Sequence, residues 1–187
     1  MTIISFTAAS GSGKTTIVDK LLKYCPDKFI IIPSYTTRKP EDRDLIGEYV
    51  YLSFKKFRNM LSNNDFKWDA NPHENLYYGT TIKSLDSAFN SNKFHLMSVV
   101  PQVMQVLYDY AQEKNSILIP FYIEPPKEKI LRERLLQRGD SNDSVNKRIK
   151  DCKKWESTAK DSNVPFIYIQ NNGTIDEAII KVLTNLI

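Results

Sequence analysis

The most constraining feature of this sequence is a glycine-rich segment that lies between a short apolar run and an amphipathic stretch. Residues 3–6 have the β-branched and aromatic composition of a buried strand, and residues 16–24 place their apolar side chains on one helical face. Between them stands Ala8-Ala9-Ser10-Gly11-Ser12-Gly13-Lys14-Thr15, which matches the P-loop pattern except that Ala8 occupies the first glycine position. The order of strand, loop and helix predicts a P-loop α/β fold.

The residue types in this segment suit a phosphate-bearing ligand. Gly11 and Gly13 allow backbone N–H groups to turn toward phosphate oxygens, and the following helix adds the partial positive charge of its N-terminus. Lys14 is expected to reach the β- and γ-phosphates, and Thr15 to offer its hydroxyl to Mg²⁺. We therefore predict a triphosphate-binding set that comprises Ser10, Gly11, Ser12, Gly13, Lys14, Thr15 and Thr16.

The rest of the chain alternates between strand-like and helix-like stretches. The predicted strands of a parallel sheet, buried on both faces, cover residues 3–6, 29–32, 94–100, 117–123 and 166–169. The stretches between them read as helices, including one over 127–137, one with Pro101 in its first turn and one that begins at a capping box on Thr174. These elements predict a three-layer sandwich around a five-stranded parallel sheet.

Two segments interrupt this alternation. Residues 34–81 hold polar turns, an alternating strand at 48–52 and a helix at 54–61, which predicts an insertion with its own small sheet. Residues 138–144 have the polar composition of a mobile turn between two helices. The expected organisation is one domain over 1–187, with a core of 1–33, 82–137 and 155–187, an insertion at 34–81 and a short lid at 138–154.

Length and composition exclude several classes of protein. A chain of 187 residues is the size of one domain, and 41% hydrophobic with 26% charged residues argues against disorder. No apolar run approaches the roughly 20 residues of a membrane span, and two cysteines fit a reducing compartment. The net charge of +4 is too small to indicate a nucleic-acid partner without a recognition motif. We expect a cytoplasmic protein with neither a membrane nor a nucleic-acid partner.

Several further motifs stand in one order along the chain. They are Ser34-Tyr35-Thr36-Thr37-Arg38-Lys39-Pro40, Gly47-Glu48-Tyr49, Tyr77-Tyr78-Gly79-Thr80, Arg134, Arg138-Gly139, Asn146-Lys147-Arg148 and Asn171. Together with the P-loop, this order and spacing resembles the guanylate kinase family of nucleoside monophosphate kinases. The resemblance covers almost the whole chain, and it rests on several separate motifs.

The resemblance implies an activity and a set of site residues. It implies direct transfer of the γ-phosphoryl group of MgATP to a phosphate oxygen of a nucleoside monophosphate, GMP, dGMP or another. The implied acceptor site contains Ser34, Arg38, Tyr49, Tyr78 and Thr80. The implied catalytic cations are Lys14, Arg38, Arg134, Arg138 and Arg148, of which the last three clamp the moving phosphoryl group when the lid closes, and Asn171 is implied near the base of ATP.

The sequence departs from the family where the family reads guanine. Lys67 stands before Trp68 at the position of a glutamate, and Ser98 and Val100 replace an acidic pair at a strand end. Guanine offers N–H donors, which a lysine repels and a valine cannot accept. Asp69 or Glu74 is a candidate for a relocated carboxylate.

The acceptor-phosphate motif also departs from the family. A second arginine is expected three residues after Arg38, but this chain has Glu41 there. Arg43 or Lys39 is a candidate to supply the missing charge, and the sequence does not choose between them.

Two alternative functions stay open at this point. The stretches 68–71 and 76–79 are similar to those of the ribose bisphosphate kinases of phosphonate metabolism, which act on a sugar phosphate. A guanylate-kinase-like domain that binds a protein without catalysis is the second alternative, although Lys14 and Thr15 are intact. We favour a nucleoside monophosphate kinase that uses ATP and Mg²⁺ and binds a small phosphorylated acceptor. The oligomeric state is left open.

Overall fold

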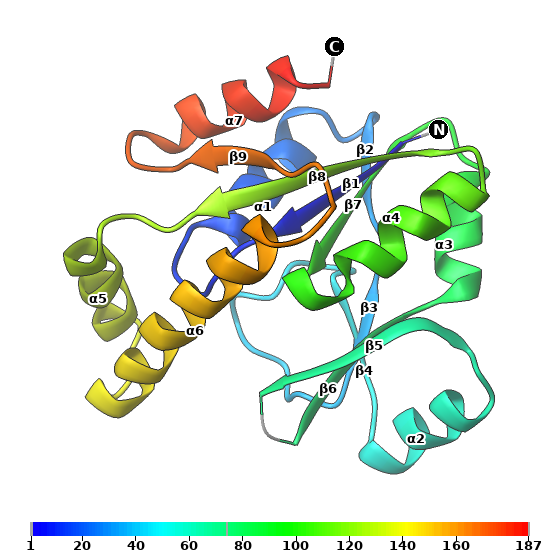
Figure 1. The fold of residues 1–187 in the computed structure, drawn as a ribbon, viewed down its shortest axis with the longest axis horizontal. Coiled ribbons are helices and arrows are strands. Elements are labelled where there is room, and N and C mark those ends of the chain that lie inside the picture. Colours follow the sequence, from blue (N-terminus) through cyan, green and yellow to red (C-terminus); the bar gives the residue numbers. More distant parts are fainter. Residues whose placement is uncertain (1, 74, 187) are drawn as a thin grey trace.

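The centre of the molecule is a five-stranded sheet in which every strand runs parallel to its neighbours (Figure 1). A computed structural model of the chain describes residues 2–73 and 75–186. The strand order is β2-β7-β1-β8-β9, and the strands span β1 Thr2–Thr7, β2 Phe29–Ile31, β7 Phe94–Val99, β8 Ile117–Glu124 and β9 Ile167–Gln170. These are the five apolar runs of the sequence, so the predicted parallel sheet is confirmed.

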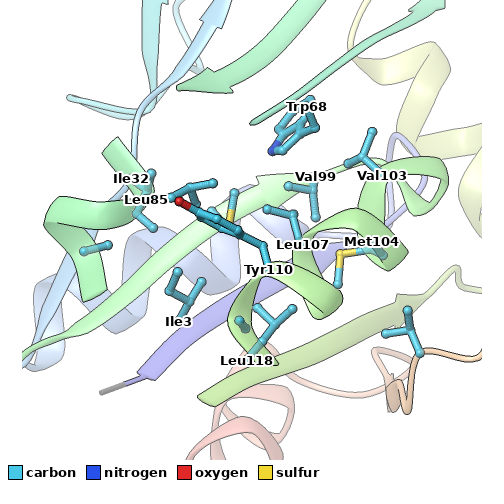
Figure 2. Packing of buried hydrophobic residues seen from close by; sticks show 14 residues of the cluster. Ile3, Ile32, Trp68, Leu85, Val99, Val103, Met104, Leu107, Tyr110 and Leu118 are labelled. Carbon is cyan, nitrogen blue, oxygen red and sulfur yellow. The ribbon is translucent and has the colours of Figure 1, made fainter. Parts of the chain in front are cut away.

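Helices cover both faces of this sheet because its strands are apolar on both. Helices α1 and α7 share one core cluster with Phe6 and Phe121, whose rings stack with their centroids 5.6 Å apart. Helices α3 and α4 share the second cluster with Ile3 and Val99 (Figure 2). These helices span α1 Lys14–Tyr24, α3 Ile82–Phe89, α4 Met104–Glu113 and α7 Ile175–Thr184. The three-layer prediction is confirmed.

The starts of two helices follow their sequence signals. At α7 the Thr174 hydroxyl accepts a hydrogen bond from the Glu177 amide, and the Glu177 carboxylate accepts one from the Thr174 amide, so the predicted capping box is present. Pro101 opens a 3₁₀ turn, η1 Pro101–Val103, and the α-helix itself begins at Met104. In residues 2–73 and 75–186, no helix combines the length and apolar character that a membrane crossing requires.

The insertion folds as a second, four-stranded sheet with one helix beside it. The strand order is β4-β3-β6-β5, with bounds β3 Ser34–Thr36, β4 Tyr49–Tyr51, β5 Phe66–His73 and β6 Leu76–Thr81, and the helix is α2 Phe54–Ser62. Trp68 of β5 is 5% exposed and belongs to the same core cluster as Val99, the last residue of β7 in the main sheet, and Val103 of η1 (Figure 2). The second sheet is therefore joined to the first through a shared apolar core.

The predicted lid is part of a helical hairpin formed by α5 (Glu128–Gln137) and α6 (Asn142–Lys160). Arg134 lies in the last turn of α5, and Arg138 lies just after that helix. Helix α6 continues without a break through position 154, where the sequence analysis ends the lid. Leu131, Leu135 and Val145 of the hairpin pack with Ala9 of the P-loop, so this hairpin is seated directly on the loop.

Candidate active site

The P-loop leads from β1 into α1 in a conformation that depends on two glycines. Gly11 and Gly13 have φ of 90° and 92°, which favours glycine. A Cβ on Gly11 would lie 2.6 Å from Leu131 Cδ1, and one on Gly13 would collide with the Asn171 amide. The Ser12 amide donates to the Ala9 carbonyl at 3.2 Å, so this N–H turns inward to the loop. The helix that follows directs its N-terminus toward any ligand in front of the loop.

A cleft of about 820 Å³ opens in front of the P-loop. The loop, the segment 38–49 of the insertion and the α5–α6 hairpin surround it. Most of the site residues predicted from the sequence line this cleft, namely Ser10, Gly11, Gly13, Lys14, Thr15, Thr16, Arg38, Tyr49, Tyr78, Arg138 and Arg148. The fold thus brings donor-side and acceptor-side residues to one place.

Lys14 meets a carboxylate that the sequence analysis did not select. Its Nζ lies 3.9 Å from Oε1 of Glu48, whose side chain is 7% exposed, and the Leu45 amide donates to Glu48 Oε2 at 3.3 Å. Burial lowers the pKa of Lys14, Glu48 raises it and Arg38 lowers it. The only sequence signal for Glu48 is its place in the Gly47-Glu48-Tyr49 motif, because a charged loop residue is ordinarily solvated.

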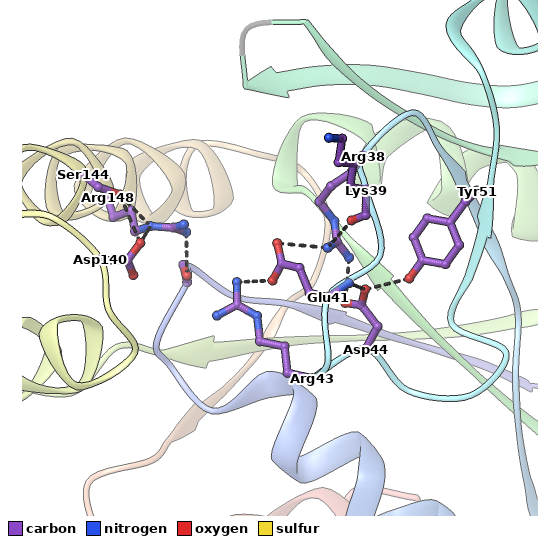
Figure 3. A network of polar contacts seen from close by, with 10 residues as sticks. Arg38, Lys39, Glu41, Arg43, Asp44, Tyr51, Asp140, Ser144 and Arg148 are labelled. Atoms are coloured by element: carbon purple, nitrogen blue, oxygen red, sulfur yellow. Dashed lines mark hydrogen bonds and ion pairs between the residues drawn. The ribbon is translucent and has the colours of Figure 1, made fainter.

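Arg38 is the centre of a charged network, which we call the Arg38 cluster and which comprises Arg38, Glu41, Arg43, Asp44 and Tyr51 (Figure 3). One guanidinium nitrogen of Arg38 lies 2.6 Å from Asp44 Oδ1, and the other lies 2.9 Å from Glu41 Oε1. The Tyr51 hydroxyl donates to the second oxygen of Asp44 at 2.6 Å. Burial lowers the pKa of Arg38, but the hydrogen bond and charge of Asp44 hold it above its ordinary value.

Tyr49 and Tyr78 stand beside Arg38 as the sequence predicts. The Arg38 guanidinium lies 4.9 Å from the centroid of the Tyr49 ring, and the rings of Tyr49 and Tyr78 meet edge to face at 6.4 Å. Burial raises the pKa of both phenols, so both remain protonated at neutral pH and keep an O–H donor. An arginine fork with two phenol donors suits a phosphate dianion.

The hairpin arginines approach the P-loop from the opposite side. Arg148 donates to the Ser10 hydroxyl at 2.8 Å and pairs with Asp140 at 3.3 Å, and Arg134 donates to the Gly11 carbonyl at 3.4 Å. Burial lowers the pKa of Arg138, and the charges of Arg43, Arg148 and Arg134 lower it further against the effect of Asp140. This concentration of positive charge is electrostatically suited to a polyanion in the cleft.

Six predicted residues do not line the cleft, and one of them is Arg134, whose contact with the P-loop is given above. Ser12 is buried, and Asn171 lies beneath the P-loop, where its amide donates to the Ser12 carbonyl at 2.8 Å. Asn171 therefore positions the loop. Ser34 is buried, with its amide bonded to the Glu48 carbonyl, and Thr80 is fully buried with no partner for its hydroxyl.

The sixth is Asp69, which is exposed on β5 and does not line the cleft. The other candidate for a relocated carboxylate, Glu74, lies outside the described residues. Lys67 points away from the cleft as well: its Nζ lies 4.0 Å from the centroid of the Tyr110 ring and 3.8 Å from Glu113 Oε2, both on α4. The amino group of Lys67 is therefore engaged by α4 outside the cleft.

The residues present fit a magnesium ion that arrives with its nucleotide. Thr15 is half-buried and lines the cleft at the start of α1. Among the described residues no group of three or more His, Cys, Asp or Glu side chains is arranged to hold a metal. Mg²⁺ often takes one or two protein oxygens and completes its shell with water and substrate phosphates. A single hydroxyl beside a phosphate loop is consistent with that mode.

Comparisons with known proteins agree with this geometry. The family model described as guanylate kinase matches residues 1–187. The chain is 29% identical to the guanylate kinase of Chlamydia abortus over 178 residues (94% of this chain, 82% of that protein). It is 31% identical to that of Blochmanniella floridana over 179 residues (88% and 82%). The crystal structure of guanylate kinase from Anaplasma phagocytophilum has the same fold, with a TM-score of 0.70, 19% identity and coverage of 99% of this chain and 84% of that one. The chain therefore belongs to the guanylate kinase family.

Proposed function

We propose that this protein is an ATP-dependent kinase that phosphorylates GMP or dGMP to the diphosphate. Its family membership supports this activity, since the relatives named above are guanylate kinases. The observation that best supports the proposal is that two groups suited to bind phosphate line the same cleft. Lys14 of the P-loop and Arg38 of the insertion both line it, and the charge of Arg38 lowers the pKa of Lys14.

The chain's own residues account for the steps of such a transfer. Lys14 and the P-loop amides hold the donor phosphates, and Thr15 offers one oxygen to the Mg²⁺ that ATP brings to neutralise its phosphates. Arg38, Tyr49 and Tyr78 hold the acceptor phosphate so that one of its oxygens faces the γ-phosphorus. The bond from the γ-phosphorus to ADP breaks as the bond to the acceptor oxygen forms. Arg138 and Arg148 supply positive charge to the phosphoryl group in transit.

The two alternatives are not favoured. The relatives named above are guanylate kinases, and the resemblance to ribose bisphosphate kinases rests only on the short stretches 68–71 and 76–79. A binding module without catalysis does not need the intact cleft described here, with Lys14, Arg138 and Arg148 all lining it.

We propose a cytoplasmic location in line with the absence of a membrane-spanning helix from the described residues.

The test is an assay of ADP release with MgATP and a panel of acceptors. The panel contains GMP, dGMP, AMP, CMP, UMP and ribose bisphosphate, and the purified full chain is used. We expect GMP and dGMP to give the highest kcat/KM. A higher value with ribose bisphosphate, or no turnover with any acceptor despite ATP binding, would contradict the proposal.

The P-loop assignment is tested by Lys14→Ala. We expect kcat to fall by roughly 10²–10³-fold, because the lysine supplies charge that the transition state requires. The circular dichroism spectrum should not change, since Lys14 lies at the helix start and packs in no core cluster. Lys20→Ala is the matched control, because Lys20 lies on the same helix and pairs with Asp176 outside the cleft. Near wild-type kcat in Lys14→Ala would show that the donor phosphates bind elsewhere.

A further inference from the structure

Glu41 occupies an unusual place between two arginines of the cleft (Figure 3). Its Oε1 lies 2.9 Å from a guanidinium nitrogen of Arg38, and its Oε2 lies 2.5 Å from one of Arg43. Both arginines line the cleft, and both carboxylate oxygens are engaged by different side chains. Two guanidinium groups that share one oxyanion form the kind of charge-assisted contact by which proteins bind phosphate.

We propose that Arg38 and Arg43 together form the binding site for the acceptor phosphate, and that Glu41 fills this site until the acceptor displaces it. The inference rests on the proposed function, since it names the residues that receive the phosphate of the nucleoside monophosphate. It assigns Arg43 as a binding residue, and it makes the Glu41 side chain an internal competitor of the acceptor.

The cluster is built so that Glu41 can leave while Arg38 stays. Arg38 keeps its 2.6 Å contact with Asp44, which is itself held by the Tyr51 hydroxyl at 2.6 Å. The backbone amide of Glu41 donates to Asp44 Oδ2 at 2.7 Å, so the main chain at this position is also fixed. The Glu41 side chain is 38% exposed. A rotation of that side chain into solvent is therefore enough to open the site.

Arg43, and not Lys39, has the placement that a second phosphate ligand needs. Lys39 is exposed, is not among the residues that line the cleft, and contacts Arg38 through its backbone carbonyl at 3.0 Å. Arg43 lines the cleft, and its positive charge contributes to the lowered pKa of Arg138 across it. Arg43 thus stands between the acceptor loop and the hairpin arginines.

The charges of the cluster favour a doubly charged occupant over the carboxylate. With Glu41 in place, Arg38 and Arg43 are balanced by Glu41 and Asp44. When the carboxylate turns away, the two arginines face the cleft with only Asp44 as counter-charge, which leaves a net positive charge for a phosphate dianion to bind. Because a dianion is attracted more strongly than a monoanion at the same distance, the exchange is favourable.

The experiment compares Arg43→Ala, Glu41→Gln and the double variant with the wild-type chain, at saturating MgATP and variable GMP. Loss of the Arg43 contact should raise the KM for GMP by roughly tenfold or more. Removal of the competing charge in Glu41→Gln should lower this KM by roughly three- to tenfold. The double variant should lose the benefit of Glu41→Gln, because that benefit requires Arg43. The KM for ATP should stay unchanged throughout.

Arg58→Ala is the matched control, since Arg58 lies on α2 of the same insertion, contacts the Phe54 ring and does not line the cleft. An unchanged KM for GMP in Arg43→Ala, or an increase in Glu41→Gln, overturns the proposal. A second measurement needs no turnover. The P-loop is filled with MgADP, inorganic phosphate is added, and the rise in unfolding temperature is measured for each variant. This rise should be largest for Glu41→Gln, intermediate for the wild type and smallest for Arg43→Ala. If no nucleoside monophosphate is phosphorylated by the wild type, the proposed function fails, while this order of stabilisation still decides the phosphate site.

Discussion

Glu48 places a buried carboxylate beside a buried lysine in the middle of the cleft. The carboxylate is fixed by the Leu45 amide, and its charge opposes the effects of burial and of Arg38 on Lys14. Two cations that converge on phosphate groups repel each other, so a nearby anion stabilises their approach. This residue is therefore as much a part of the site as the cations that the sequence motif revealed.

Glu48→Gln tests this role. We expect kcat to fall by roughly three- to tenfold, because the neutral amide no longer holds the Lys14 ammonium group against the repulsion of Arg38. Glu113→Gln is the control, since Glu113 pairs with Lys67 outside the cleft. Steady-state assays of ADP release provide the measurement, and equal kcat values for both variants would contradict a role for Glu48.

The carboxylate of Asp44 should make the stability of the protein depend on pH. Burial raises the pKa of its carboxyl, but hydrogen bonds from Arg38, Tyr51 and the Glu41 amide outweigh burial and lower it overall. A carboxyl with a lowered pKa in the folded state stabilises the protein above its unfolded pKa of about 3.9, and this contribution is lost as the pH falls through the lower folded pKa. Asp44→Asn should therefore reduce the free energy of unfolding by about 1–2 kcal/mol at pH 7.

The difference between Asp44→Asn and the wild type should shrink as the pH falls below about 4. Urea unfolding curves at several pH values give the measurement. Asp42→Asn serves as the control, because Asp42 is an exposed neighbour in the same loop. A difference that stayed constant down to pH 3 would show that the Asp44 charge is not the source of the stability.

At the level of helices and strands, the sequence was a good guide where a local pattern decides the outcome. The five apolar runs, the P-loop and the Thr174 capping box could each be predicted, because burial on two faces, positive φ and a cap are all properties of short segments. The packing of α6 on the P-loop could not, since the apolar side of this helix contacts Ala9, which is far away in the sequence.

The contacts of long side chains could not be predicted from local sequence patterns either. The resemblance placed Lys67 at the position of a guanine-reading glutamate, and the structure adds that β5 pairs irregularly with β6 between Phe66 and Trp68 and that the Lys67 amino group lies over Tyr110 of α4. The contact of Asn171 with the P-loop likewise joins segments that are far apart in the sequence. The choice between Arg43 and Lys39 likewise depended on which of the two lines the cleft.

At the scale of the whole molecule, the two sheets share a core through Trp68. We expect Trp68→Ala to lower the free energy of unfolding by about 3–5 kcal/mol, as is usual for truncation of a large buried side chain. Because Trp68 packs in one cluster with Val99 of the other sheet, the loss should affect both sheets in one cooperative transition.

Circular dichroism and the fluorescence of Trp155 should report the same unfolding midpoint in Trp68→Ala. Tyr24→Ala is the matched control, since Tyr24 is an aromatic residue that is 57% exposed. Two separated transitions, with the second sheet unfolding first, would show that the insertion is an independent unit.

The hydrogen bond from Arg148 to the Ser10 hydroxyl bears on the order in which substrates arrive. It ties the long helix α6 to the loop that surrounds the donor phosphates, so a nucleotide that enters there must compete for the same guanidinium group. Arrival of the donor is thereby coupled to the release of this hydrogen bond. The proposed acceptor site lies after β3, at Arg38, where the phosphate competes with Glu41 and not with a residue of α6. We expect either substrate to bind first. Only the donor competes directly for a hydrogen bond made by α6.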